Sequence, residues 1–121
     1  MGTIIQHLSY KVSSLKDEIE FFLLFERLNI FHEFVNQQGE RYGVMFHLEN
    51  GLDVELFQSA SPIISPDVHF AFGVSDIKHL HVTLSFAHVT SGIFRGKTDG
   101  ILQFHVVSPG GFRFEFHEMG A

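Results

Sequence analysis

Apolar and polar residues alternate along several short stretches of the chain, and this period of two predicts β-strands. The clearest case is the stretch 112–117, in which three phenylalanines alternate with Arg113, Glu115 and His117. Near the N-terminus, Leu8 and Tyr10 share one side of a predicted strand and the polar residues lie on the other. The same pattern, bounded by turn residues, predicts strands over residues 4–12, 30–34, 42–48, 52–57, 68–74, 92–94, 101–107 and 112–117.

Two stretches have helical periodicity and follow a capping residue. Ser14 with Asp17 three positions later resembles a capping box, and an apolar stripe then predicts a helix over residues 15–28. Asp76 is the corresponding cap for a helix over residues 77–87. Both helices carry enough apolar residues to pack on a sheet.

Turn residues separate the strands. Asn50-Gly51 stands between two apolar runs, which is a strong signal for a tight hairpin because both residues tolerate positive φ. Ser108-Pro109-Gly110-Gly111 predicts the equivalent turn near the C-terminus.

The chain contains an internal repeat. The sequence around His7 recurs around His69 at an offset of 62, and the sequence around Glu55 recurs around Glu115 at an offset of 60. A third match, at an offset of 58, pairs Phe46-His47-Leu48 with Phe104-His105-Val106. A tandem duplication explains these matches, and each copy keeps one His and one Glu at corresponding places.

The repeat defines the predicted organisation. Module one covers residues 4–58, an extended Ser- and Pro-rich linker covers 59–67, and module two covers 68–118. In each module the predicted elements run strand–helix–strand–strand–strand. We therefore predict an α+β fold of two tandem βαβββ modules in a single domain.

Composition excludes several classes of protein. The chain has 121 residues, of which 45% are hydrophobic, so it can bury a core. Its formal net charge is −6 and its Lys and Arg residues are scattered, which argues against nucleic-acid binding. No apolar run approaches the roughly 18 residues that cross a bilayer, so we expect no membrane partner. The absence of cysteine and of a secretory signal leads us to expect a cytoplasmic protein.

Strand parity brings together four candidate metal ligands. His7, Glu55, His69 and Glu115 all lie on the strand face opposite to the apolar residues that would pack on the helices. If the two copies turn these faces toward each other, two imidazoles and two carboxylates converge, and such donors suit Zn, Ni, Co, Fe or Mn. The open positions of such an ion would allow Lewis-acid chemistry, with one carboxylate acting as a base.

Further polar residues share this parity or are related by the repeat. They are candidates for contact with a small-molecule substrate, or for structural roles at the rim of the site: Lys11, His47, His105 and Arg113.

The sequence around the four candidate ligands resembles that of the vicinal oxygen chelate superfamily. This superfamily includes glyoxalase I, bleomycin-resistance proteins, fosfomycin-resistance proteins and extradiol dioxygenases. The stretch beginning at His7 looks like the first strand of that family, and the stretch beginning at His69 looks like its fifth. Val107 to Phe116 looks like the last hairpin, which ends in an apolar-Glu-apolar strand. The resemblance implies that the two modules form a curved mixed sheet around a central cavity, and that the protein is a homodimer.

The resemblance also implies a ligand set and an activity. The family places metal ligands on its first, fourth, fifth and eighth strands, at positions that hold His7, Glu55, His69 and Glu115 here. This set is similar to that of glyoxalase I and implies Ni or Zn as the metal. Glu55 or Glu115 would move the proton while an enediolate forms from a substrate with vicinal oxygens.

Two positions depart from the short bacterial glyoxalases. Lys11 and Ser59 stand where those enzymes have the Arg and Asn that hold glutathione. The resemblance therefore leaves the substrate open. It also leaves two alternative functions, which are a metal-independent binding protein of the bleomycin-resistance type and an iron-dependent extradiol dioxygenase.

Overall fold

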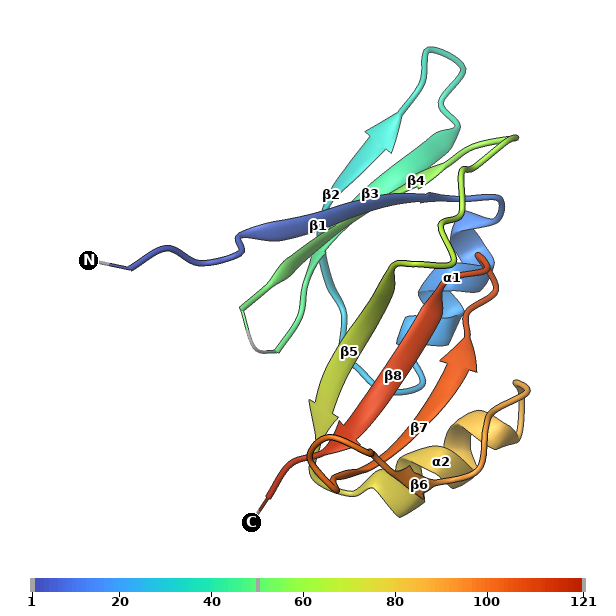
Figure 1. Ribbon diagram of the computed structural model, residues 1–121. Coiled ribbons are helices and arrows are strands. Elements are labelled where there is room, and N and C mark those ends of the chain that lie inside the picture. Colours follow the sequence, from blue (N-terminus) through green and yellow to red (C-terminus); the bar gives the residue numbers. More distant parts are fainter. Residues whose placement is uncertain (1, 50, 121) are drawn as a thin grey trace. The chain divides into compact units, whose positions relative to one another are not determined.

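The computed structural model describes residues 2–49 and 51–120, and it divides into two compact units, Met1–Ile63 and Ile64–Ala121 (Figure 1). Unit 1 contains β1, α1, β2, β3 and β4, with bounds His7–Val12, Leu15–Phe22, Asn29–Val35, Arg41–His47 and Asp53–Gln58. Unit 2 contains β5, α2, β6, β7 and β8, with bounds His69–Val74, Ile77–Ser85, Phe94–Arg95, Leu102–Val107 and Arg113–Glu118. Each unit therefore has the predicted βαβββ order.

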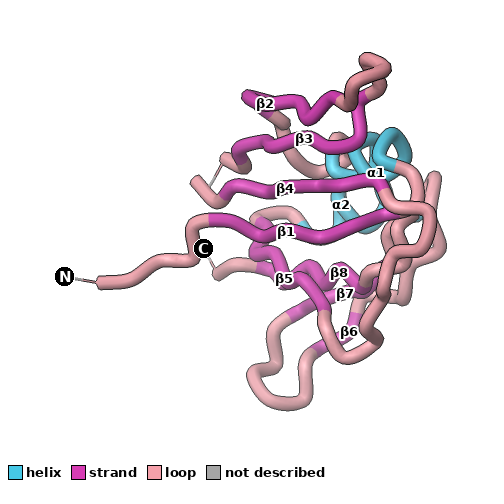
Figure 2. The backbone as a smooth tube through the Cα atoms, turned by 90° about the horizontal axis from the view of Figure 1, so that it is seen from above, coloured by secondary structure: helices cyan, strands magenta, loops and turns pink. Residues whose placement is uncertain are grey.

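Each unit builds one four-stranded mixed sheet. The strand orders are β1-β4-β3-β2 and β5-β8-β7-β6 (Figure 2). The first strand of each unit pairs in parallel with the last strand, and the remaining pairs are antiparallel. The predicted fold class is confirmed by this tandem βαβββ arrangement.

Strand alternation gives each sheet a helix-covered face and an open face. In unit 1, Val54, Leu56 and Phe46 are buried, and the ring of Phe46 lies 5.1 Å from that of Phe22 on α1. In unit 2, Phe104 is buried in the same way and meets His81 of α2 at a ring separation of 4.9 Å. The opposite faces carry the polar residues of the alternation.

Both predicted helix caps are present. The Ser14 hydroxyl accepts a hydrogen bond from the Asp17 backbone amide at 3.2 Å, and the Asp76 carboxylate accepts one from the His79 backbone amide at 3.1 Å. The predicted end of the first helix is wrong, because α1 stops at Phe22 and not near residue 28. The next residues tighten into turns, in which the Leu24 amide donates to the Phe21 carbonyl at 3.1 Å.

Three other elements differ from prediction by two or more residues at one end. β1 begins at His7 and not at residue 4. The helix predicted over 77–87 ends at Ser85, and the strand predicted over 92–94 is the two-residue β6, Phe94–Arg95. The turn glycines match prediction, with Gly51 at φ 93° and Gly111 at φ 90°; Asn50 lies outside the described residues.

Within the described residues, no helix combines the length and the apolar character needed to cross a bilayer.

A buried carboxylate ties α1 to the first strand. Glu18 is fully buried, and its carboxylate accepts a hydrogen bond from the Tyr10 hydroxyl at 2.8 Å. Burial, followed by the nearby Glu18 charge and this hydrogen bond, raises the pKa of Tyr10 well above its usual range, so the phenol keeps its proton. A polar contact inside the core thus helps to fix the helix on the sheet.

Replacing Tyr10 by Phe should lower the free energy of unfolding by about 1–3 kcal/mol, because a buried carboxylate loses one of its donors. Urea unfolding measures the change. Tyr42→Phe is the matched control, since Tyr42 is 42% exposed, and it should stay within about 0.5 kcal/mol of wild type. Equal stability of Tyr10→Phe and wild type would contradict a stabilising role for the hydrogen bond.

Candidate functional site

The structure places one predicted His–Glu pair on the open face of each sheet. In unit 1, His7 Nε2 lies 3.9 Å from Glu55 Oε1. In unit 2, His69 Nε2 lies 3.2 Å from Glu115 Oε2. The sheet register produces both pairs, because each His lies opposite the residue two positions before the Glu.

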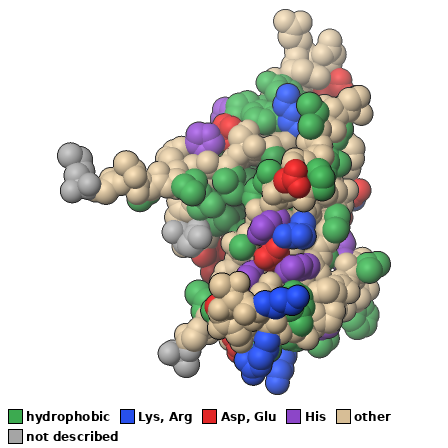
Figure 3. Space-filling view, viewed as in Figure 1, with side chains coloured by type: hydrophobic (Ala, Val, Ile, Leu, Met, Phe, Trp, Pro, Cys, Tyr) green, Lys and Arg blue, Asp and Glu red, His purple; other side chains and the backbone are tan. Residues whose placement is uncertain are grey.

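Glu115 is surrounded by cationic and titratable side chains. Its carboxylate side chain is only 8% exposed, and Arg113 Nη2 lies 2.6 Å from Oε2, beside His69. On the other oxygen, Oε1, His117 Nε2 lies at 3.1 Å and His105 Nε2 at 3.6 Å. Figure 3 shows histidine, basic and acidic side chains gathered over the β5–β8 part of unit 2.

These neighbours favour the charged form of the Glu115 carboxyl group. Burial alone would raise the pKa of Glu115, but the hydrogen bond from His117 and the charges of His105, His69 and Arg113 outweigh it. The pKa of Glu115 is therefore lowered. The pKa of His105 is also lowered, first by burial and then by the nearby Arg113, His117 and His69, against the opposing effect of Glu115.

The unit 1 site has different surroundings. His47 Nδ1 lies 2.5 Å from Asp53 Oδ1, and the Phe31 ring stacks on the His47 ring at 4.1 Å. His7 and His47 both lie opposite Asp53 in the sheet register, one on each neighbouring strand. The second nitrogen of His7, Nδ1, contacts the side-chain oxygen of Gln6.

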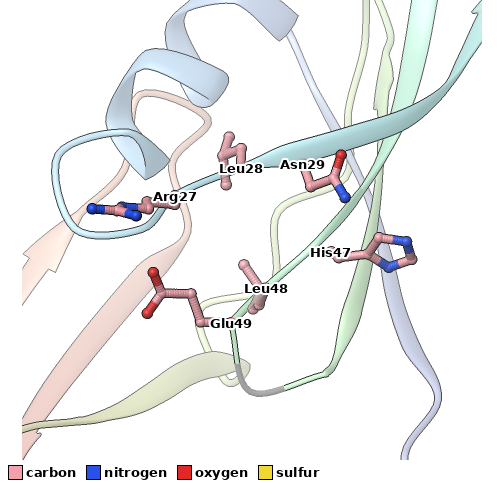
Figure 4. Close-up of a pocket in the computed structure, with 6 residues that line it drawn as sticks. All are labelled: Arg27, Leu28, Asn29, His47, Leu48 and Glu49. Carbon is pink, nitrogen blue, oxygen red and sulfur yellow. The ribbon is translucent and has the colours of Figure 1, made fainter.

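A hollow of about 310 Å³ lies at the His47 end of unit 1 (Figure 4). Arg27 and Glu49 point toward one end of it, and Asn29 and His47 point toward the other. Neither Glu55 nor His7 lines this hollow.

The register corrects one prediction from the repeat. His47 lies opposite Asp53, whereas His105 lies opposite Glu115, so these two histidines do not occupy equivalent places. The residue equivalent to His105 is Met45, which lies opposite Glu55. The match at an offset of 58 was misaligned by two residues, because β3 and β7 share the offset of 60 found for the last strands.

Two contacts were missed or left unassigned at the sequence level. His117 forms a hydrogen bond with Glu115. The sequence indicated this contact, because the two residues are two positions apart on one strand and so share a face. The Arg113–Glu115 ion pair was indicated in the same way. Lys11 lies in register with Phe57 at the other end of the unit 1 face.

The donor atoms of each His–Glu pair lie near the separation that ligands of one ion adopt. Two ligand atoms about 2.1 Å from one ion lie about 3.0–3.4 Å apart. The separation of His69 and Glu115, 3.2 Å, fits this range, and the 3.9 Å of His7 and Glu55 is slightly wider. No group of three or more His, Asp or Glu side chains in residues 2–49 and 51–120 is arranged to hold an ion. Each pair alone therefore has suitable donors but does not complete a site.

The chain is similar in structure to several solved proteins. A glyoxalase family protein from Enterococcus faecalis matches with a TM-score of 0.75 and 18% identity, over 95% of this chain and 97% of that chain. The fosfomycin resistance protein FosX from Listeria monocytogenes matches with a TM-score of 0.79 and 12% identity, over 99% and 96%. A possible glyoxalase from Bacillus cereus matches with a TM-score of 0.74 and 16% identity, over 96% and 99%. No protein-family model and no curated protein sequence matches the chain.

These neighbours are members of the vicinal oxygen chelate superfamily. The chain has the fold of that superfamily, as its sequence motifs predicted. At these identities the likeness establishes the fold alone.

Metal-free protein should lose stability as the pH falls from about 7 to about 5. The pKa of His105 is lower in the folded protein than in the unfolded chain. The unfolded chain therefore binds more protons on acidification, and the equilibrium shifts away from the folded state. The lowered pKa of Glu115 acts in the same direction at lower pH. Urea unfolding in a chelator at several pH values measures the slope.

His105→Gln should make this slope shallower, and His79→Gln, which changes an exposed residue of α2, should leave it unchanged. An unchanged slope in His105→Gln would contradict the assignment.

Proposed function

We propose that this protein is a metal-dependent lyase or isomerase of the glyoxalase I type, acting on a small substrate with vicinal oxygens. The observation that carries the proposal is the pair of His–Glu contacts, His7–Glu55 and His69–Glu115, at matched positions of the two units. The fold supports it, because solved proteins with this fold include glyoxalase family members.

In this proposal, His7, Glu55, His69 and Glu115 hold one divalent ion. Imidazole nitrogens and carboxylate oxygens suit Ni or Zn, with Co, Fe and Mn as further candidates. One structural neighbour, a mutant form of FosX from Listeria monocytogenes, has been solved with Mn(II) and 1S,2S-dihydroxypropylphosphonic acid. The four ligands would come from one chain or from two chains of a homodimer.

When bound, such an ion supplies Lewis-acid polarisation of two adjacent substrate oxygens. Glu55 or Glu115 would take a proton from the carbon beside the substrate carbonyl and return it to the neighbouring carbon, so that the reaction passes through an enediolate. Arg113 and Lys11 would contact anionic oxygens of the substrate. His47, oriented by Asp53, and His105 would donate or accept hydrogen bonds at its edge.

A second candidate function is metal-independent binding, as in bleomycin-resistance proteins. One contact favours it, because Arg113 Nη2 lies 2.6 Å from Glu115 Oε2, the oxygen that also faces His69. An arginine paired with a carboxylate satisfies that carboxylate without an ion.

Calorimetric titration of metal-stripped protein with Ni(II) and Zn(II) tests the proposal. Wild type should bind one ion per four-ligand site with a dissociation constant below the micromolar range. Glu55→Gln and Glu115→Gln should each weaken binding by more than about tenfold, because each replaces a charged carboxylate ligand by a neutral amide. Glu33→Gln is the matched control, since Glu33 is an exposed strand residue paired with Arg41, and it should bind as wild type does.

Three results separate the alternatives. Loss of binding in both site variants supports the four-ligand ion site. Loss in only one of them assigns the ion to that unit alone and contradicts the quartet. Wild-type protein that binds neither metal supports the metal-independent binding function.

A further inference from the structure

The open face of the unit 1 sheet changes character along its strands. One cross-strand row contains His7, Asp53 and His47, and the next contains Ser9, Glu55 and Met45. The row after that contains Lys11, Phe57 and Gly43, with Phe34 opposite Gly43 on β2; this third row is named the aromatic row. The aromatic row therefore begins two residues from Glu55 on the same face of β4.

Three rings form a continuous platform: Phe57 and Phe34 of the aromatic row, and Tyr42, which precedes Gly43 on β3. The Phe57 ring lies 4.9 Å from the Phe34 ring and 6.3 Å from the Tyr42 ring. Phe57 and Phe34 are half-buried, and Tyr42 is 42% exposed. The helix-side core of β4 is built by residues of the other parity, Val54 and Leu56, so the Phe57 ring is not needed to fill it.

Gly43 leaves room for the Phe57 ring in this position. A Cβ at residue 43 would lie 2.6 Å from Phe57 Cδ1 and 2.9 Å from Phe57 Cε1. Real Cβ atoms do not approach ring carbons so closely, so the ring can lie over β3 only because residue 43 is glycine. The glycine at position 43 thus allows an aromatic ring to lie beside Glu55.

Unit 2 repeats this arrangement only in part. In the sheet register, Phe94 takes the place of Phe34, but His117 takes that of Phe57, His105 that of Met45, and Gln103 that of Gly43. The duplicated strands keep the Glu at the same point, and only unit 1 has both an apolar residue opposite it and a phenyl ring two residues along the same strand. The Phe57 ring over Gly43 is therefore a property of this unit and not a requirement of the fold.

We infer that unit 1 selects a substrate in which an aromatic or similarly flat apolar group adjoins the vicinal oxygens. With those oxygens at His7 and Glu55, the adjoining group lies over Met45 and Phe57. Flat rings prefer to pack against aromatic side chains, and Lys11, which is in register with Phe57 on the neighbouring strand, favours a substrate that is also anionic. The inference rests on the proposed function, because it takes the position of the vicinal oxygens from it.

Two hydroxamates test the inference as a matched pair. Benzohydroxamate and acetohydroxamate each present a carbonyl oxygen and an adjacent N-hydroxyl oxygen, and they differ in a phenyl against a methyl group. Calorimetric titration of Ni(II)-loaded wild type should give about tenfold tighter binding of benzohydroxamate. In Phe57→Ala the two dissociation constants should agree within about twofold.

Two further variants serve as controls. Phe57→Leu keeps an apolar side chain, should unfold at the wild-type temperature and should give an intermediate ratio. Phe86→Ala removes a ring that is 93% exposed at the end of α2, and it should keep the wild-type ratio.

Equal affinity of Ni(II)-loaded wild type for both probes would overturn the inference and leave the proposed function standing. A tenfold preference that survives in Phe57→Ala would also overturn it. So would a change of oligomeric state in Phe57→Ala, measured by sedimentation, that accompanies equal binding of the probes, since the platform would then be an interface between copies of the chain. Failure of both probes to bind would overturn the proposed function together with the inference.

Discussion

The parallel pairing of the first and last strands in each unit is the constraint on which the candidate site depends. His7 lies opposite Asp53, and His69 lies opposite Arg113, so each His has its unit's Glu as a diagonal neighbour on the same face. A slip of one residue would send the Glu to the helix side of the sheet. The buried residues of opposite parity, such as Val54 in unit 1, hold the register, so the core and the site are fixed by the same pairing.

The duplicated units keep this pairing but differ in what surrounds the carboxylate. Glu115 meets Arg113, His105 and His117, whereas Met45 and Phe57 occupy the register positions around Glu55. Since β1, β4 and β3 pair in the same register as β5, β8 and β7, the difference around the carboxylate comes from side chains. One unit therefore offers charge and hydrogen bonds to a ligand, and the other offers apolar area.

Short-range periodicity was sufficient to predict which residues share a strand face. Alternation in β8 predicted that Glu115 and Arg113 lie on one face, and the repeat predicted that Glu55 is the counterpart of Glu115. The end of α1 was predicted too late, because its apolar residues continue past Phe22 while the backbone tightens into turns. The prediction that His47 and His105 are equivalent in the repeat was wrong for another reason. Cross-strand register is set by contacts between distant residues, and a three-residue match cannot determine it.

The contacts of His69 explain how Arg113 bears on ion binding in unit 2. Arg113 Nη2 lies 3.0 Å from His69 Nδ1, and a guanidinium can only donate, so Nδ1 accepts and the ring proton of neutral His69 lies on Nε2. The Nε2 atom itself lies 3.2 Å from Glu115 Oε2. For Nε2 to become a ligand, the proton must move to Nδ1, and Arg113 must then leave that nitrogen. Arg113 also pairs with Glu115 Oε2, so it opposes ion binding directly at that oxygen and indirectly at His69, through the other ring nitrogen. In the proposed function, its release would free a guanidinium beside the site for an anionic substrate oxygen, so that one side chain would link ion uptake to substrate recognition.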